Sequence, residues 1–201
     1  MSIPSTLACR WLARDIGTIA GFLSAAECGA YVRLGESIGY EEAPVSTAAG
    51  MVMIKDVRNN DRIMLDDAQR AAGLWQRVRP VVPPRFKKKW QPVGVNERLR
   101  FYRYDVGQQF DWHHDGCFER ANGERSFFTF MIYLNEDFEG GETSFQDKGR
   151  VGDSFAPFAV SPRTGMALLF HHPIAHKGEP VRRGRKYVLR TDVMFARGPA
   201  A

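Results

Sequence analysis

The hydrophobic positions in the first third of the chain follow a helical period. Ser24, with Glu27 three residues later, has the spacing of a helix capping box, and apolar residues at helical spacing follow it. A second set of apolar residues at helical spacing occupies about 66–79, and a pair of prolines comes after it. We therefore predict two helices separated by a loop-rich stretch over 40–62, and we interpret residues 1–90 as a helical N-terminal support region.

From about residue 91 the pattern changes to one that is typical of strands. Residues 99–104 and 186–195 alternate between apolar and polar positions, whereas 127–134 is continuously apolar, as in a strand that is covered on both faces. Short strands at a spacing of roughly ten residues, with turn residues between them, indicate a barrel or jelly roll. We expect a single domain over 1–201, mainly β with flanking helices (α+β), whose β core is 91–201.

The composition is that of an ordinary globular protein, with 201 residues of which 44% are hydrophobic and 25% are charged. No stretch reaches the roughly 20 apolar residues that a membrane span needs, and Met1–Gly17 lacks the apolar segment of a signal peptide. The three cysteines are widely spaced and form no Cys-x-x-Cys pair, which is typical of a reducing compartment. We therefore expect a cytoplasmic protein without a membrane partner.

The net charge of +5 is the feature that bears on partners, and basic residues concentrate at 85–89 and 182–186. Such a balance attracts nucleic acid or acidic substrates. No loop of aromatic residues suited to stacking on bases is evident. The sequence therefore disfavours nucleic acid as a partner but does not exclude it.

All five histidines fall into two clusters, His113-His114 and His171, His172 and His176. On a strand, His113 and Asp115 point to the same side, because residues two apart share a face. Two imidazoles and one carboxylate on one face of a metal form the facial triad of Fe(II) oxygenases, and the second cluster must supply the third ligand. A zinc hydrolase can use the same ligands, so the residues alone leave both chemistries open.

Two cations near the C-terminus are candidates for binding an anionic cosubstrate. Lys186 and Arg190 share one face of the alternating stretch 186–195. A buried cation needs a partner, and a carboxylate of 2-oxoglutarate would supply one.

Four motifs in the same order and at similar spacing give the chain a family resemblance. They are the stretch from Tyr104 to Asp115 (YDVGQQFDWHHD), Tyr133-Leu134-Asn135, the stretch from Gly140 to Phe145 (GGETSF), and the stretch from His176 to Lys186 (HKGEPVRRGRK). Through them the chain resembles the Fe(II)/2-oxoglutarate-dependent dioxygenases, and specifically their prolyl 4-hydroxylase-like branch.

The resemblance implies a double-stranded β-helix (jelly roll) core with the N-terminal helices packed against it. It implies Fe(II) held by His113, Asp115 and His176. It also implies 2-oxoglutarate bound through Lys186, with help from Tyr133 and with Tyr104 and Thr143 beside it, while Arg190 stays the second candidate cation. Dioxygen is then the second cosubstrate, succinate and CO₂ are the co-products, and ascorbate is the reductant.

One position departs from the pattern and leaves the substrate open. Collagen-type prolyl hydroxylases carry a tryptophan six residues after the basic cosubstrate ligand, and this chain has Asp192 there. We therefore expect hydroxylation of either a peptidyl substrate, prolyl residues included, or a small molecule. The alternatives are a nucleic-acid demethylase of the same barrel class and a non-catalytic, cupin-like metal-binding module.

Overall fold

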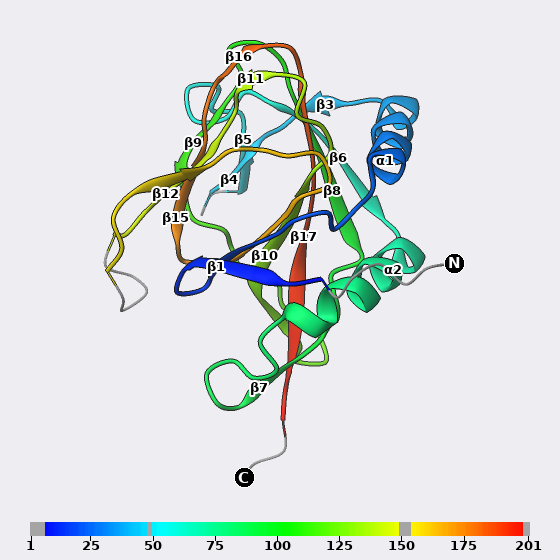
Figure 1. Cartoon of the computed structure of the whole chain (residues 1–201), viewed down its shortest axis with the longest axis vertical. Coiled ribbons are helices and arrows are strands. Elements are labelled where there is room, and N and C mark those ends of the chain that lie inside the picture. The colour runs from blue at the N-terminus through cyan, green and yellow to red at the C-terminus, as the bar shows by residue number, and fades with distance from the viewer. Residues whose placement is uncertain (1–6, 48–49, 149–153, 199–201) are drawn as a thin grey trace.

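Strands form most of the fold, and they build two sheets that face each other (Figure 1). The computed structural model describes residues 7–47, 50–148 and 154–198. Side chains from both sheets meet in one buried cluster, which includes Tyr102 and Val188 from the larger sheet and Phe145 from the smaller one. The mainly β character expected from the sequence is therefore confirmed.

The larger sheet has the strand order β1-β2-β14-β10-β17-β8-β6-β3, and β7 also pairs with β17. Within the described ranges its strands are β1 (Cys9–Ala13), β2 (Ile16–Ile19), β3 (Glu41–Glu42), β6 (Asp61–Asp66), β7 (Trp90–Val95), β8 (Arg98–Tyr104), β10 (Arg125–Tyr133), β14 (Ala167–His171) and β17 (Lys186–Arg197).

The smaller sheet has the order β13-β12-β15-β9. Its strands are β9 (Phe110–His113), β12 (Thr143–Gln146), β13 (Phe158–Val160) and β15 (Ala175–Gly178). Two further pairs complete the strands: β4 (Val45–Thr47) with β5 (Gly50–Val52), and β11 (Glu139–Gly140) with β16 (Val181–Arg183).

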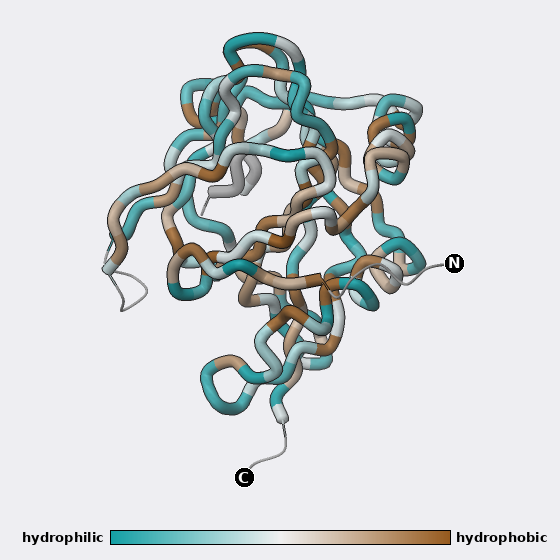
Figure 2. The backbone as a smooth tube through the Cα atoms, in the orientation of Figure 1, coloured by the Kyte–Doolittle hydropathy of each residue, from teal (hydrophilic) through white to brown (hydrophobic). Residues whose placement is uncertain are grey.

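The continuous apolar run in β10 follows from its position between β14 and β17, in the interior of the larger sheet. Phe128 and Phe130 point to one side and belong to the cluster that the helices cover. Tyr133 points to the other side, into the cluster between the sheets. Figure 2 shows the same division, because hydrophobic residues follow the strands that cross the middle of the molecule and hydrophilic residues occupy the loops at its ends.

Two helices pack against the outer face of the larger sheet, as their shared buried cluster with its strands shows. Helix α1 (Ala25–Ile38) begins with the capping box that the sequence predicts: the Glu27 amide donates to Ser24 Oγ, and the Ser24 amide donates to the Glu27 carboxylate. Helix α2 (Ala68–Val78) is capped by Asp67 and leads into the 3₁₀ turn η1 (Arg79–Val81). No helix among the described residues has the length and apolar character that a membrane crossing requires.

The prediction of a helical region over 1–90 is wrong for the segments outside these two helices, because the described part of it also contains strands β1–β6. Strand β2 pairs with β14, from which nearly 150 positions separate it in sequence, for example Ile19 with Ala167. Strand β6 pairs along its whole length with β8. Each of these strands is stabilised by its partner in the sheet. Short segments in which apolar and polar residues barely alternate carry no local signal of that pairing.

Gly165 joins the N-terminal segment to the β core. The Leu23 amide donates to the Gly165 carbonyl (3.1 Å), and Gly165 has a φ of +75°. A Cβ added at Gly165 would lie 1.9 Å from the Leu23 carbonyl oxygen. This close approach of the two backbones therefore requires a residue without a side chain.

We predict that Gly165→Ala lowers the free energy of unfolding by at least about 2 kcal/mol, through the left-handed backbone and the clash with Leu23. Urea denaturation measures this. Gly73→Ala in α2 is the matched control, because nothing lies within 4 Å of its added Cβ; we expect it to stabilise the protein by about 0.5–1 kcal/mol. Equal stability of Gly165→Ala and the wild type would contradict the assignment of this contact.

Candidate metal centre

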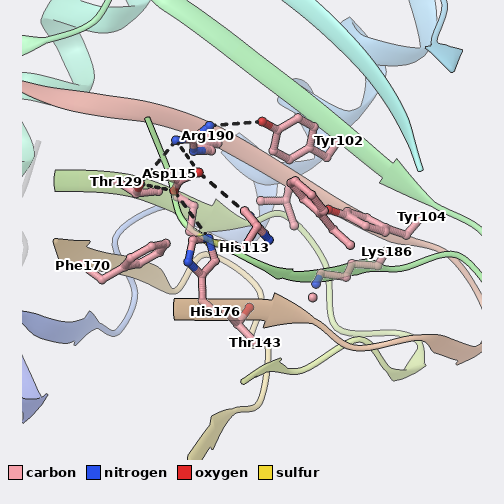
Figure 3. Close-up of a pocket in the computed structure, with 14 residues that line it drawn as sticks. Tyr102, Tyr104, His113, Asp115, Thr129, Thr143, Phe170, His176, Lys186 and Arg190 are labelled. Atoms are coloured by element: carbon pink, nitrogen blue, oxygen red, sulfur yellow. Dashed lines mark hydrogen bonds and ion pairs between the residues drawn. The ribbon is translucent and has the colours of Figure 1, made fainter. Parts of the chain in front are cut away.

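His113, Asp115 and His176 come together between the two sheets (Figure 3). One ligand atom from each lies within 4.8 Å of the others. His113 ends β9, and His176 on β15 is its direct partner in the antiparallel register, so pairing of the two strands places both imidazoles side by side. Asp115 lies beyond the end of β9, where its amide donates to the His172 carbonyl (3.1 Å); this bond positions it, whereas the sequence analysis placed it on a regular strand.

Both imidazoles are oriented in the same way. His113 Nδ1 lies 2.7 Å from the carbonyl of Asp111, and His176 Nδ1 lies 2.9 Å from the carbonyl of Ile174. Each Nδ1 therefore carries the proton that it donates to the backbone, which leaves each Nε2 lone pair free toward Asp115. Rings of Phe110 and of Phe170 pack on the two imidazoles and fix their planes.

The protonation states suit a divalent cation. Burial lowers the pKa of His113 and of His176, so both imidazoles are neutral near pH 7. Burial alone would raise the pKa of the Asp115 carboxyl, but the positive charge of Arg190 holds it well below its usual range. Two neutral imidazoles and one carboxylate are the donor set of the facial triad, so the residues present fit Fe(II).

A second layer of polar residues orients Asp115. Thr129 Oγ1 donates to Asp115 Oδ2 and also lies 3.0 Å from His172 Nδ1, while His172 Nε2 lies 2.8 Å from Ser126 Oγ. Thr129 and Ser126 are fully buried, and His172 is nearly so. The sequence analysis missed this layer. It treated 127–134 as continuously apolar, although Thr129 places a hydroxyl within that run.

Arg190 is held by acidic groups. Its Nη2 lies 3.0 Å from Asp115 Oδ1 and 3.1 Å from Asp192 Oδ1, and the second oxygen of Asp192 binds Arg100 at 3.0 Å. Asp192, the departure from the family pattern, is therefore the buried anion shared by Arg100 and Arg190. Figure 3 shows Arg190 on the Asp115 side of the pocket and Lys186 apart from it, so the geometry favours Lys186 as the cation for a cosubstrate.

Lys186 faces the same pocket as the three candidate ligands. Its ammonium donates to the Gly141 carbonyl (2.7 Å), and no carboxylate of the described residues lies within ion-pair distance. Burial lowers the pKa of Lys186 to about 7, and the charge of Glu142 only partly opposes this. A buried ammonium without a counter-ion is what a dicarboxylate would complete.

The other predicted cosubstrate residues lie around Lys186. Tyr104 lines the pocket, with its ring centroid 4.9 Å from Lys186 Nζ. Thr143 lines it too, and its hydroxyl lies 2.6 Å from the hydroxyl of Tyr133. Tyr133 is fully buried, with its ring centroid 5.6 Å from Lys186 Nζ.

The remaining histidines have separate surroundings. His114 lines an open groove next to the triad. His171 is buried against the rings of Phe86 and Phe128, on the side away from the triad, and burial lowers its pKa to about 4.

Comparison with known proteins agrees with this geometry. Residues 99–191 match the sequence model of the 2OG-Fe(II) oxygenase superfamily. The chain is 30% identical to a probable prolyl 4-hydroxylase 7 of Arabidopsis thaliana, over 83% of this chain and 58% of that protein.

Two solved structures have a similar fold. A Pseudomonas putida prolyl-4-hydroxylase matches with a TM-score of 0.65 and 18% identity, over 89% of this chain and 92% of that chain. A Trichoplax adhaerens prolyl hydroxylase, in complex with a peptide fragment of the hypoxia inducible factor oxygen degradation domain, matches with a TM-score of 0.65 and 16% identity, over 89% of this chain and 83% of that chain.

The chain spans less than two thirds of the length of the first curated relatives that it matches, between 57% and 63% of each. The matched segment includes His113, Asp115, Lys186 and His176. Over residues 99–191 the chain matches the 2OG-Fe(II) oxygenase superfamily, and it is similar to the prolyl 4-hydroxylases.

Proposed function

We propose that this protein is an Fe(II)- and 2-oxoglutarate-dependent hydroxylase of peptidyl substrates, prolyl residues included. Substrate, 2-oxoglutarate and dioxygen are converted to hydroxylated substrate, succinate and CO₂. One observation carries the proposal: a three-residue metal centre and a buried ammonium without a carboxylate partner line the same pocket.

In this proposal His113, Asp115 and His176 hold Fe(II), which when bound supplies the activation of dioxygen for decarboxylation of the 2-oxo acid and hydroxylation of the substrate. Lys186 Nζ takes up a proton and pairs with the distal carboxylate of 2-oxoglutarate. Thr129 and Arg190 keep the Asp115 carboxylate ionised and in place. Side chains from both sheets surround the pocket in which the cosubstrate would bind.

A peptide is the proposed substrate class for two reasons. The curated relatives are named as prolyl 4-hydroxylases, and one structural neighbour is a prolyl hydroxylase in complex with a peptide fragment. In addition, an open groove adjoins the metal centre and shares His113 and Asp115 with it.

We further propose that the two facing sheets are a double-stranded β-helix, that residues 1–201 act as one domain, and that the protein works in the cytoplasm. The three cysteines support the last point, since all of them are free: Cys28 is buried and Cys117 is exposed.

The proposal is tested by succinate release from 2-oxoglutarate, without added substrate, by protein reconstituted with Fe(II). We expect slow turnover that requires Fe(II). His176→Ala should abolish both turnover and stoichiometric metal binding while the protein stays folded by circular dichroism, because two of three ligands do not hold the ion. Full turnover in His176→Ala would rule out the triad, and absence of both turnover and 2-oxoglutarate binding in the wild type would rule out the proposed function.

We predict that affinity for 2-oxoglutarate falls as pH rises above about 7. Lys186 has a pKa of about 7 without the cosubstrate, and a bound carboxylate must raise it, so binding takes up a proton above pH 7. The dissociation constant should increase by up to about tenfold per pH unit, as measured by calorimetry on Mn(II)-loaded protein. Lys186→Arg is the control, since arginine stays charged and its profile should be flat. A flat profile in the wild type would contradict the role of Lys186.

Thr129→Val should weaken metal affinity by about 10–100-fold, because it removes the hydroxyl that bonds Asp115 at nearly constant side-chain volume. Competition with a fluorescent chelator measures this. Thr18→Val on β2 is the matched control, since it changes a half-buried threonine away from the centre. Equal metal affinity of Thr129→Val and the wild type would show that the backbone alone orients Asp115.

A further inference from the structure

An arginine-lined groove opens beside the metal centre, and Lys186 is not among its lining residues. Five arginines line it: Arg58, Arg62, Arg98, Arg100 and Arg190. The groove shares Tyr102, Phe110, His113 and Asp115 with the cosubstrate pocket, so a molecule bound in it lies next to the metal ligands.

Three of these arginines are neutralised by carboxylates. Arg98 pairs with Asp66 at 2.8 Å, and Arg100 and Arg190 share Asp192. Arg190 also pairs with Asp115, which would be shared with the metal. For Arg58 and Arg62, no carboxylate within the described ranges lies at ion-pair distance, and the groove carries a surplus of positive charge there.

Arg58 is the more deeply buried of the two, with 4% of its surface exposed. Its guanidinium lies between the rings of Tyr102 (4.8 Å) and Phe110 (4.5 Å), and its Nε donates to Asn60 Oδ1 (2.8 Å). Its Nη2 is buried without a hydrogen-bond partner among the residues that the structure describes. A desolvated cation with an unused donor is costly unless an anion completes it.

Arg62 lies next to Arg58 in the same groove. It is the direct partner of Tyr102 in the pairing of β6 with β8, so its side chain shares the face of the sheet that carries Tyr102. Burial lowers the pKa of Arg62, and the charges of Arg58, Arg100 and Arg190 lower it further. Arg62 therefore sits in a field of like charge that an anion would relieve.

We propose that Arg58 and Arg62 bind a carboxylate side chain of the peptide substrate, so that the enzyme selects acidic sequence beside the residue that it hydroxylates. This inference rests on the proposed function. The carboxylate cannot be that of 2-oxoglutarate bound at Lys186, because neither Arg58 nor Arg62 lines the cosubstrate pocket.

The test is a binding measurement that needs no turnover. Fluorescent decapeptides of alanine with one central proline, flanked on both sides by Glu, Gln, Lys or phosphoserine, are titrated with protein loaded with Mn(II) and 2-oxoglutarate, and anisotropy is recorded. We expect the Glu peptide to bind at least about tenfold more tightly than the Gln peptide, and its affinity to fall as salt rises. Equal affinities of the Glu and Gln peptides, or binding of the phosphoserine peptide alone, would overturn the proposal.

Variants locate the effect. Arg62→Gln should weaken binding of the Glu peptide by about tenfold, and Arg62→Glu should reverse the preference toward the Lys peptide. Arg58→Lys keeps the charge in case Arg58→Gln fails to fold, and it should retain the preference for Glu. Arg183→Gln is the matched control, because Arg183 is exposed and pairs with Glu139 away from the groove. Unchanged affinity in Arg62→Gln would overturn the assignment of Arg62.

The two proposals fail in different ways. Succinate release by the wild type in the absence of any peptide tests the proposed function and does not depend on the groove. Turnover of 2-oxoglutarate without a preference for acidic peptides would overturn the groove assignment alone. Loss of both turnover and 2-oxoglutarate binding would overturn the function on which it rests.

Discussion

The buried ion pair between Asp115 and Arg190 is the interaction on which the rest of the site depends. A carboxylate between two sheets stays ionised only if cations and hydrogen-bond donors replace the water that it loses. Arg190 and Thr129 supply these. Arg190 is then itself a buried charge, and Asp192 partners it from two residues along the same strand. The network thus extends outward from one carboxylate until its last member, Arg100, reaches the edge of the groove.

Strand β17 gives its two inward-facing cations different surroundings. Lys186 and Arg190 are four residues apart on one face, so both point into the space between the sheets. Arg190 lies opposite Arg100 on β8, and such a pair of like charges is tolerated because Asp192 contacts both. Lys186 lies opposite Tyr104 and has an aromatic ring and a backbone carbonyl for neighbours. The charge of Arg190 is therefore compensated by carboxylates of the protein, whereas the charge of Lys186 is left for a ligand to compensate.

The site also explains why a basic groove lies next to the metal centre. Acidic groups in this region are already used: Asp66, Asp115 and Asp192 each pair with an arginine. Arg58 and Arg62 therefore remain in excess, which is an unfavourable arrangement in the free protein. An anion bound beside these two arginines would offset that excess of positive charge.

The sequence by itself determined the elements with a local signal: the capping box at Ser24 and Glu27, the buried strand over 127–134, and the order and spacing of the motifs that identify the superfamily. These follow from contacts within a few residues, which periodicity and cap residues encode. Only the tertiary structure decided that β2 and β6 are strands, that Arg190 binds Asp115, and that Thr129 and His172 support the same carboxylate. Each of those depends on a partner far away in the chain, and neither hydrophobic period nor motif spacing carries the register that brings such partners together.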